Sequence, residues 1–290
     1  MMHTIKNDFY EIGITNYGAE LVSMKTKDGF EHIWHNTKDY WSDHAPLLFP
    51  VCGRLKDSTY TLNGKSYHMP MHGFAYTTDF DLVSKEETKI TFSLSSSEWT
   101  KEMFPFDFLI SATYELLGDK LVFTFTVKNT GSEKMPYMFG WHPGFNLPTD
   151  NGQDINDYEL DLGKDCVIWH KLPKGESNRI AVDFPLLNNS YKLCEEQIYE
   201  QDTMIFTGQK NSTKLFAKGH PYLLEMDWTD NLPTLCVWKW PKNDAKYICI
   251  EPWGSLPKDG VTDENFDIRP MPRLMPGEVD TYTYSVKITC

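Results

Sequence analysis

The chain has 290 residues, of which 40% are hydrophobic and 14% aromatic, enough for a large buried core. Its formal net charge is −13 with no run of lysines or arginines, which argues against nucleic acid and against anionic membranes as partners. No apolar stretch approaches the ~20 residues of a membrane span, and the first residues lack the apolar segment of a signal peptide. We therefore expect a cytoplasmic protein.

The cysteines agree with a reducing compartment. They form no C-x-x-C pair and mostly stand among apolar neighbours, so we expect reduced, buried thiols rather than a disulfide framework. The six positions are Cys52, Cys166, Cys194, Cys236, Cys249 and Cys290.

The predicted elements are mainly strands joined by tight turns. Asp-Gly and Asn-Gly pairs supply the positive φ of two-residue hairpin turns, and residues 121–127 alternate apolar side chains with threonine. The predicted hairpins pair 21–27 with 30–34 around Asp28-Gly29, 60–62 with 65–69 around Asn63-Gly64, and 110–116 with 121–127 around Gly118-Asp119. Further strands are expected at 235–240, 247–251 and 281–288.

Helical signals are few. Residues 95–103 favour one short capped helix that ends before Pro105, and residues 193–199 favour another. Strands and helices do not alternate along the chain, which argues against a parallel α/β fold. We therefore predict an all-β fold, a large antiparallel β-sandwich, with residues 1–290 forming a single domain.

Three short stretches each place one proton-transfer residue among apolar, glycine and proline neighbours. They are Met71–Ala75 with His72, Phe139–Pro148 with His142, and Ile248–Trp253 with Glu251. Two imidazoles and a carboxylate suit general acid–base chemistry on a neutral, hydroxyl-rich substrate.

The settings of His142 and Glu251 favour a functional role. Gly140, Pro143 and Gly144 surround His142, so the backbone can present its ring at the wall of a cleft. Glu251 ends an apolar strand, where burial would raise its pKa toward the range of a useful base. The alternatives are a hydrogen-bonded structural histidine, which also applies to His72, and a glutamate paired with a cation at a strand end.

Two more polar residues are candidates for substrate binding. Arg54 could donate hydrogen bonds to sugar hydroxyls or serve as a salt-bridge partner. Asp202 could have a functional role, or it could be an ordinary turn or cap residue at the start of a possible strand.

Metal and cofactor motifs are weak or missing in this sequence. His32 and His35, or His68 and His72, have spacings that suit a metal, but neither pair has a clustered third ligand and Pro70 interrupts the second. Phosphate-loop, dinucleotide, nucleophile-elbow and zinc-protease patterns do not occur. We expect no metal site and no cofactor.

Taken in chain order, six segments resemble the aldose 1-epimerase (galactose mutarotase-like) family, and within it the bacterial LacX-like branch. The similarity extends over nearly the whole chain. The segments are Asn16–Leu21, Pro50–Leu55, His72–Ala75, Trp141–Leu147, Asp202 and Ile250–Trp253.

The resemblance implies a β-supersandwich and a reaction that opens and closes a sugar ring. In that family the residue matching Glu251 is the general base on the anomeric hydroxyl, and the residue matching His142 is the general acid on the ring oxygen. The residues matching His72, Arg54 and Asp202 hold the sugar. We expect a buried Glu251 and a protonated His142 to stabilise each other's charged forms.

Alternatives remain open at the level of the sequence. Sugar-phosphate members of the wider family often read His-Gly-Phe-Ala-Arg, whereas Tyr76 follows Ala75 here, which disfavours a hexose-6-phosphate 1-epimerase. A non-catalytic carbohydrate-binding protein on the same fold is a second alternative. A glycoside hydrolase using Glu251 and Asp202 is a third. The sequence carries no signal of oligomeric state.

Overall fold

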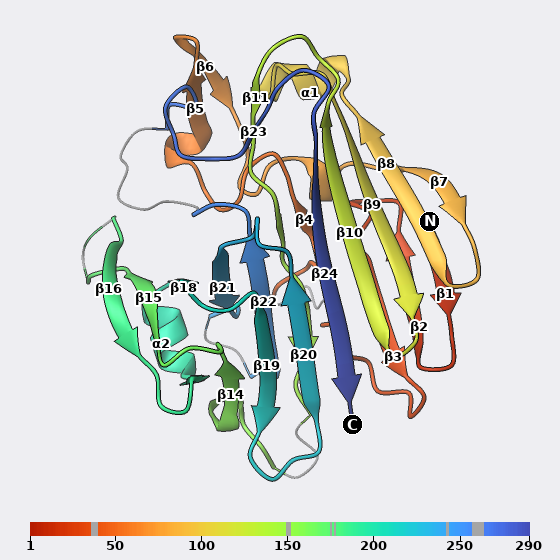
Figure 1. Ribbon diagram of the computed structural model, residues 1–290, viewed down its shortest axis with the longest axis vertical. Helices are drawn as coiled ribbons and strands as arrows, with labels where there is room; N and C mark the ends of the chain where they lie inside the picture. Colours follow the sequence, from red (N-terminus) through yellow and green to blue (C-terminus); the bar gives the residue numbers. More distant parts are fainter. Residues whose placement is uncertain (36–39, 149–151, 175, 177, 242–243, 257–263) are drawn as a thin grey trace.

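The computed structural model describes residues 1–35, 40–148, 152–174, 176, 178–241, 244–256 and 264–290. Within these residues, antiparallel strands predominate (Figure 1). The larger sheet has nine strands, in the order β17 (Ser190–Lys192), β14 (Tyr158–Asp161), β19 (Ser212–Ala217), β20 (Leu223–Trp228), β24 (Val279–Thr289), β10 (Lys120–Asn129), β9 (Phe108–Leu117), β8 (Lys89–Ser95) and β7 (Asp81–Lys85).

The second sheet carries the residues of greatest interest. Its order is β16 (Ile180–Pro185), β15 (Cys166–Lys171), β18 (Met204–Thr207), β21 (Thr234–Trp238), β22 (Tyr247–Trp253), β12 (Gly140–Trp141) and β4 (Leu47–Leu48), with β13 (Gly144–Asn146) also paired to β22. Smaller sheets are formed by β1 (Met2–Lys6), β2 (Tyr10–Thr15) and β3 (Leu21–Thr26), by β5 (Thr59–Leu62) and β6 (Lys65–His68), and by β11 (Met135–Pro136) and β23 (Arg273–Leu274).

Aromatic side chains join the two large sheets face to face. Phe125 of β10 stacks on Phe139, just before β12, with ring centroids 3.9 Å apart and planes 3° from parallel. Beside them, Trp141 of β12 packs on Phe123 of β10 and on Tyr284 of β24, at 5.0 and 5.3 Å. Aromatic pairs of this kind add to the free energy gained from apolar burial. The segment that leads to His142 is therefore anchored in the core, and the predicted antiparallel β-sandwich is confirmed.

The two α-helices are short, as predicted. α1 (Glu98–Met103) begins after Ser97, whose Oγ accepts a hydrogen bond from the backbone N–H of Thr100, while the Thr100 hydroxyl accepts one from the Ser97 N–H. This reciprocal cap satisfies two backbone donors that the first helical turn leaves unpaired. α2 (Glu195–Glu200) matches the second prediction. Neither helix, at six residues, could reach across a bilayer, and none of the other described residues forms a longer one.

Two of the three predicted hairpins form as expected. β5 and β6 turn at Asn63-Gly64, with φ of 49° and 72°, and β9 and β10 turn at Gly118, with φ of 58°. The hairpin predicted around Asp28-Gly29 is wrong in its second arm, since residues 30–34 form only isolated bridges. There the Glu31 carboxylate accepts hydrogen bonds from the backbone N–H groups of Met24 and Ile33, in place of a regular ladder.

The prediction for the cysteines is half correct. All six thiols are unpaired, and Cys52, Cys236 and Cys249 are buried, but the other three are exposed. Cys166 begins the strand β15, Cys194 precedes the first turn of α2, and Cys290 is the last residue of the chain. Positions at the ends of elements leave a side chain open to solvent even where its sequence neighbours are apolar.

Candidate active site

Glu251 lies on β22, within the second large sheet. All seven residues of this strand are buried, and Glu251 itself is 1% exposed. β21 pairs with one edge of β22 and places Cys236 opposite Glu251, while β12 and β13 pair with the other edge. Because side chains of a strand alternate between faces, Cys249, Glu251 and Trp253 share one face of the sheet.

His142 follows β12 and faces Glu251. Its backbone N–H donates to the carbonyl of Pro46 at 3.1 Å, and its ring packs on Trp41 and Trp238 with centroid distances of 4.9 and 5.4 Å. Nε2 of His142 lies 3.2 Å from Oε2 of Glu251. The two candidate proton-transfer groups, 109 positions apart in the chain, are thus in contact (251 − 142 = 109).

His72 lies on the loop that follows β6 and is close to His142. Its backbone is left-handed, with φ of 65°, and its ring lies 5.6 Å from that of His142, centroid to centroid. Nδ1 of His72 accepts a hydrogen bond from the backbone N–H of Gly53 at 3.1 Å. This bond assigns the proton of the neutral ring to Nε2, which leaves His72 a hydrogen-bond donor.

Arg54 and Asp202 form an ion pair at the more open side. Nη1 of Arg54 lies 3.3 Å from Oδ2 of Asp202, and the side chains are 69% and 57% exposed. An exposed pair of this kind contributes little to stability. Asp202 has a φ of 61° and stands in the turn between α2 and β18, so it precedes the strand that the sequence analysis placed it on.

All five candidate residues line one cavity of about 500 Å³. This volume lies in the range of small-molecule sites. Aromatic and apolar side chains form much of its wall. Sequence reasoning did not single out the further lining residues Trp41, Asp43, Arg179, Trp238, Trp240 and Trp253.

Some of these missed residues carried a signal in the sequence. Trp238 and Trp240 are spaced by two, as expected for one face of an extended segment, and Trp253 stands two positions beyond Glu251. Arg179 and Asp43 stand in segments without a recognisable motif. Arg179 donates hydrogen bonds to the carbonyls of His170 and Gln201, at 2.9 and 2.8 Å.

Burial determines the electrostatics of the site. It raises the pKa of Glu251 well above 4.5 and lowers the pKa of His142 well below 6.5, the latter with help from His72. Burial, and then the charge of Arg54, lower the pKa of His72 to about 4. Both directions run against the ion pair that the sequence analysis expected of Glu251 and His142. Because desolvation penalises both charges, burial favours the neutral form of the pair, with the proton on the carboxyl group.

Asp43 adds a further carboxyl group to the cavity wall. Burial, followed by the charge of Glu20, raises its pKa to about 6. Tyr76, which follows Ala75, lines the same cavity.

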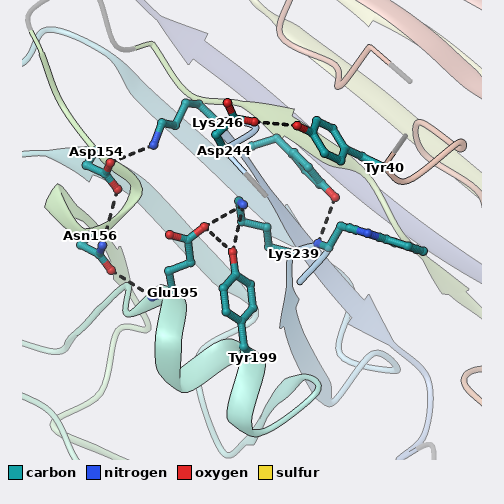
Figure 2. A network of polar contacts seen from close by, with 10 residues as sticks. Tyr40, Asp154, Asn156, Glu195, Tyr199, Lys239, Asp244 and Lys246 are labelled. Atoms are coloured by element: carbon teal, nitrogen blue, oxygen red, sulfur yellow. Dashed lines mark hydrogen bonds and ion pairs between the residues drawn. The ribbon is translucent and has the colours of Figure 1, made fainter. Parts of the chain in front are cut away.

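A buried ion pair holds the segment that leads to Asp202. The side chain of Lys239, just after β21, is fully buried, and its Nζ lies 2.7 Å from Oε1 of Glu195 and 3.2 Å from the hydroxyl of Tyr199 (Figure 2). Glu195 and Tyr199 belong to α2. This cluster ties α2 to the chain between Trp238 and Trp240, and so couples two walls of the cavity.

A group of possible metal ligands includes His142 and Glu251 of the cavity wall and Cys249 beside them, which does not line the cavity. His142, Cys249 and Glu251 each offer one ligand atom, and these atoms lie within 4.8 Å of one another. Among the described residues, one group of three or more histidine, cysteine, aspartate or glutamate side chains brings its ligand atoms this close together, and it is this one. The two histidine pairs considered from the sequence do not form one, and Nε2 of His32 instead contacts the hydroxyl of Thr26 at 2.7 Å.

Gly73, next to His72, is essential for the local backbone. Its φ is +79°, and a Cβ there would lie 2.2 Å from the carbonyl oxygen of Phe49. Gly64 has a similar φ of +72°, but a Cβ there would meet nothing within 4 Å. We expect Gly73→Ala to lower the free energy of unfolding by about 3 kcal/mol or more and Gly64→Ala by about 1 kcal/mol. Urea unfolding measures both, and equal losses would contradict the role of the close contact.

Comparison with known proteins agrees with this geometry. The profile that represents the aldose 1-epimerase family matches residues 1–287. The chain belongs to the aldose 1-epimerase family. Among related family members, the chromosomal protein LacX of Lactococcus lactis subsp. lactis is 27% identical over 98% of both chains. The galactose mutarotase of Rattus norvegicus is 23% identical over 57% of this chain and 52% of its own length.

A solved structure supports the assignment of the chain to this family. The galactose mutarotase related enzyme from Lactobacillus acidophilus superposes with a TM-score of 0.91 and 30% sequence identity, covering 99% of this chain and 97% of that one. The resemblance first noted from six short segments is thus confirmed across the whole fold.

Proposed function

We propose that the protein is an aldose 1-epimerase that interconverts the α and β anomers of a free hexose. The observation that carries the proposal is the 3.2 Å contact between Nε2 of His142 and Oε2 of Glu251 inside a cavity of about 500 Å³. A relative that is named a galactose mutarotase supports it. The reaction needs one acid and one base in reach of the same hemiacetal, and these two groups supply them.

Ring opening moves two protons. Glu251 as carboxylate takes the proton of the C1 hydroxyl while His142 as imidazolium donates its proton to the ring oxygen. The bond between C1 and the ring oxygen breaks, and C1 becomes the aldehyde carbon. Rotation about C1–C2 presents the other carbonyl face, and the two residues then reverse their roles as the ring closes.

The neutral pair favoured by burial fits this cycle. It is the state reached after ring opening, when Glu251 holds the proton and His142 has lost it. The ionised pair contains the same number of protons, so one proton shift between the two groups converts one state into the other. The contact of 3.2 Å makes that shift short.

The remaining candidates would bind the sugar. His72 can donate from Nε2, because its Nδ1 is occupied by the backbone N–H of Gly53. Arg54 and Asp202 offer a donor and acceptors at the open side. The tryptophans of the wall present apolar faces of the kind against which sugar C–H groups pack.

Two arginines in the cavity keep a hexose 6-phosphate as the second candidate substrate. Arg54 is paired with Asp202, however, and Arg179 already donates to two backbone carbonyls. With Tyr76 in place of an arginine, the cavity lacks the uncommitted guanidinium group that phosphate recognition favours. We therefore favour the free aldose.

Polarimetry on freshly dissolved sugars tests the function directly. We expect the approach to anomeric equilibrium to accelerate for free aldoses and much less for their 6-phosphates. Binding of the sugars without any acceleration would favour a non-catalytic carbohydrate-binding protein. Faster turnover of the 6-phosphates would reverse the assignment of the substrate.

The pH dependence should reflect the shifted groups. Activity requires that the pair hold a single proton. A second proton binds below the lowered pKa of His142, and the single proton is lost above the raised pKa of Glu251. We expect kcat/KM to be flat between the lowered pKa of His142 and the raised pKa of Glu251, and therefore through pH 6.5, after subtraction of the uncatalysed rate at each pH. An acidic limb with a midpoint near 6.5, the ordinary value for histidine, would contradict the burial of His142.

We also infer that the protein acts as a single domain in the cytoplasm. One continuous cluster of buried hydrophobic residues includes side chains from both large sheets. Six unpaired cysteines suit a reducing compartment.

A further inference from the structure

Cys249 is a buried thiol next to the proton-transfer pair, and the proposed mechanism does not use it. Its position on β22 places it two residues from Glu251 on the same face of the sheet. Its backbone pairs with Gly144 of β13 on one side and with Trp238 of β21 on the other, so it lies close to the loop that holds His142. Its sulfur and the ligand atoms of His142 and Glu251 lie within 4.8 Å of one another.

The three ligand types match the zinc group of metals. Imidazole nitrogen, thiolate sulfur and carboxylate oxygen are the protein ligands of Zn²⁺, with bonds of about 2.0–2.3 Å. Two such bonds span up to about 4.6 Å, so a small movement of the side chains would bring all three atoms onto one ion. The softness of the thiolate disfavours Mg²⁺ and Ca²⁺ at the same place.

Glu251 is poised to accept a cation. The side chain is 1% exposed; Oε1 has no hydrogen-bond partner among the described residues, and Oε2 has only the 3.2 Å contact with Nε2 of His142. A buried oxygen without a partner is destabilising, and a metal ion would satisfy it while taking the place of the contact between the two side chains. The cavity above provides the route of entry and room for a fourth ligand, a water molecule or a sugar hydroxyl.

Charge balance also favours a dication. When the metal–sulfur and metal–oxygen bonds form, the thiol and the protonated carboxyl each release a proton to solvent. The thiolate and the carboxylate then carry two negative charges against the two positive charges of the ion. The complex is neutral overall, which suits a buried position.

We propose that His142, Cys249 and Glu251 form a binding site for a zinc-group dication, and that the bound ion inhibits the protein. Inhibition follows because the ion occupies the acid and the base at once. The inhibition, though not the binding, rests on the proposed function.

A cadmium titration tests the binding independently of activity. We expect Cd²⁺ added in thiol-free buffer to the full chain, with the exposed Cys166, Cys194 and Cys290 replaced by serine in every sample, to produce a thiolate-to-cadmium charge-transfer band in the ultraviolet that saturates at one equivalent. Cys249→Ala should remove this band, and Cys249→Ser, which preserves the volume of the side chain, should do the same. Cys236→Ala removes a buried thiol from the neighbouring strand and should keep it.

Inhibition by Zn²⁺ provides the second readout. For each variant, inhibition is expressed as the ratio of its turnover rate with Zn²⁺ to its turnover rate without Zn²⁺, so that differences in basal activity cancel. We expect Cys249→Ala to need at least about 100-fold more Zn²⁺ for half-inhibition, since even outer-shell changes weaken metal sites by 10–100-fold, whereas Cys236→Ala should match the wild type.

The two readouts separate the possible failures. No band when Cys249 is present, or a band that survives in Cys249→Ala, overturns the site. A Cys249-dependent band without inhibition overturns the regulatory role. If the protein turns over none of the sugars tested, the band still decides whether the metal site exists.

Discussion

Glu251→Gln is expected to lower kcat by roughly 10²–10⁴-fold, the contribution of one positioned general base. The amide keeps the shape of the side chain and its place on β22, but it cannot take the proton of the anomeric hydroxyl. Polarimetry on the purified variant gives the rate, and Glu11→Gln, an exposed change on β2, is the matched control. Activity within tenfold of the wild type would remove Glu251 from the mechanism.

Stability separates a lost base from a damaged fold. Burial raises the pKa of Glu251 in the folded state, so its contribution to stability is fully present below the unfolded-state value near 4.5 and declines as the pH rises toward the folded-state pKa. Glutamine does not titrate. The Tm of Glu251→Gln relative to the wild type should therefore rise with pH. A Tm difference that falls with pH would contradict the direction of the pKa shift.

His142→Asn should reduce kcat by a similar factor, roughly 10²–10⁴-fold, because the ring oxygen then lacks a proton donor. Binding should change less, since His72, Arg54 and Asp202 remain to hold the sugar. The informative measurement is the split between kcat and KM. His68→Asn, an exposed change on β6, serves as the control and should leave both unchanged.

The opposite pattern would reassign His142. A large rise in KM with an unchanged kcat would make it a binding residue. The pH dependence of stability adds a second check, and its direction is opposite to the one expected for Glu251→Gln. Because the pKa of His142 is lowered in the folded state, its contribution is present above the unfolded value near 6.5 and is lost as the pH falls. His142→Asn should therefore gain stability relative to the wild type at acidic pH.

Local sequence signals predicted elements wherever a backbone preference sufficed. The Asn63-Gly64 turn needs positive φ at both positions, and the structure has it. The same reasoning failed after Asp28-Gly29. There the carboxylate of Glu31 accepts hydrogen bonds from backbone N–H groups that could otherwise have paired with a neighbouring strand. A side chain that competes with the backbone leaves no trace in the pattern of apolar residues.

The five candidate residues were found because each stands in a distinctive stretch. Their meeting in one cavity depends on sheet order, since β12 follows β10 in the chain but pairs with β22 across the second sheet. Arg179 and Asp43 reach the same cavity from segments without a motif, and only the packing of distant segments reveals them.

The sequence by itself therefore determined the all-β class, two of the three predicted hairpins and the choice of the two candidate proton-transfer residues, since these follow from short-range preferences and recognisable segments. The tertiary structure decided the environment of those residues and how they are arranged. The contact between His142 and Glu251, the directions of their pKa shifts and the proximity of Cys249 all depend on how the strands are paired and buried. Burial is a property of the assembled sheets, and for that reason the pKa of a side chain cannot be derived from its neighbours in the sequence.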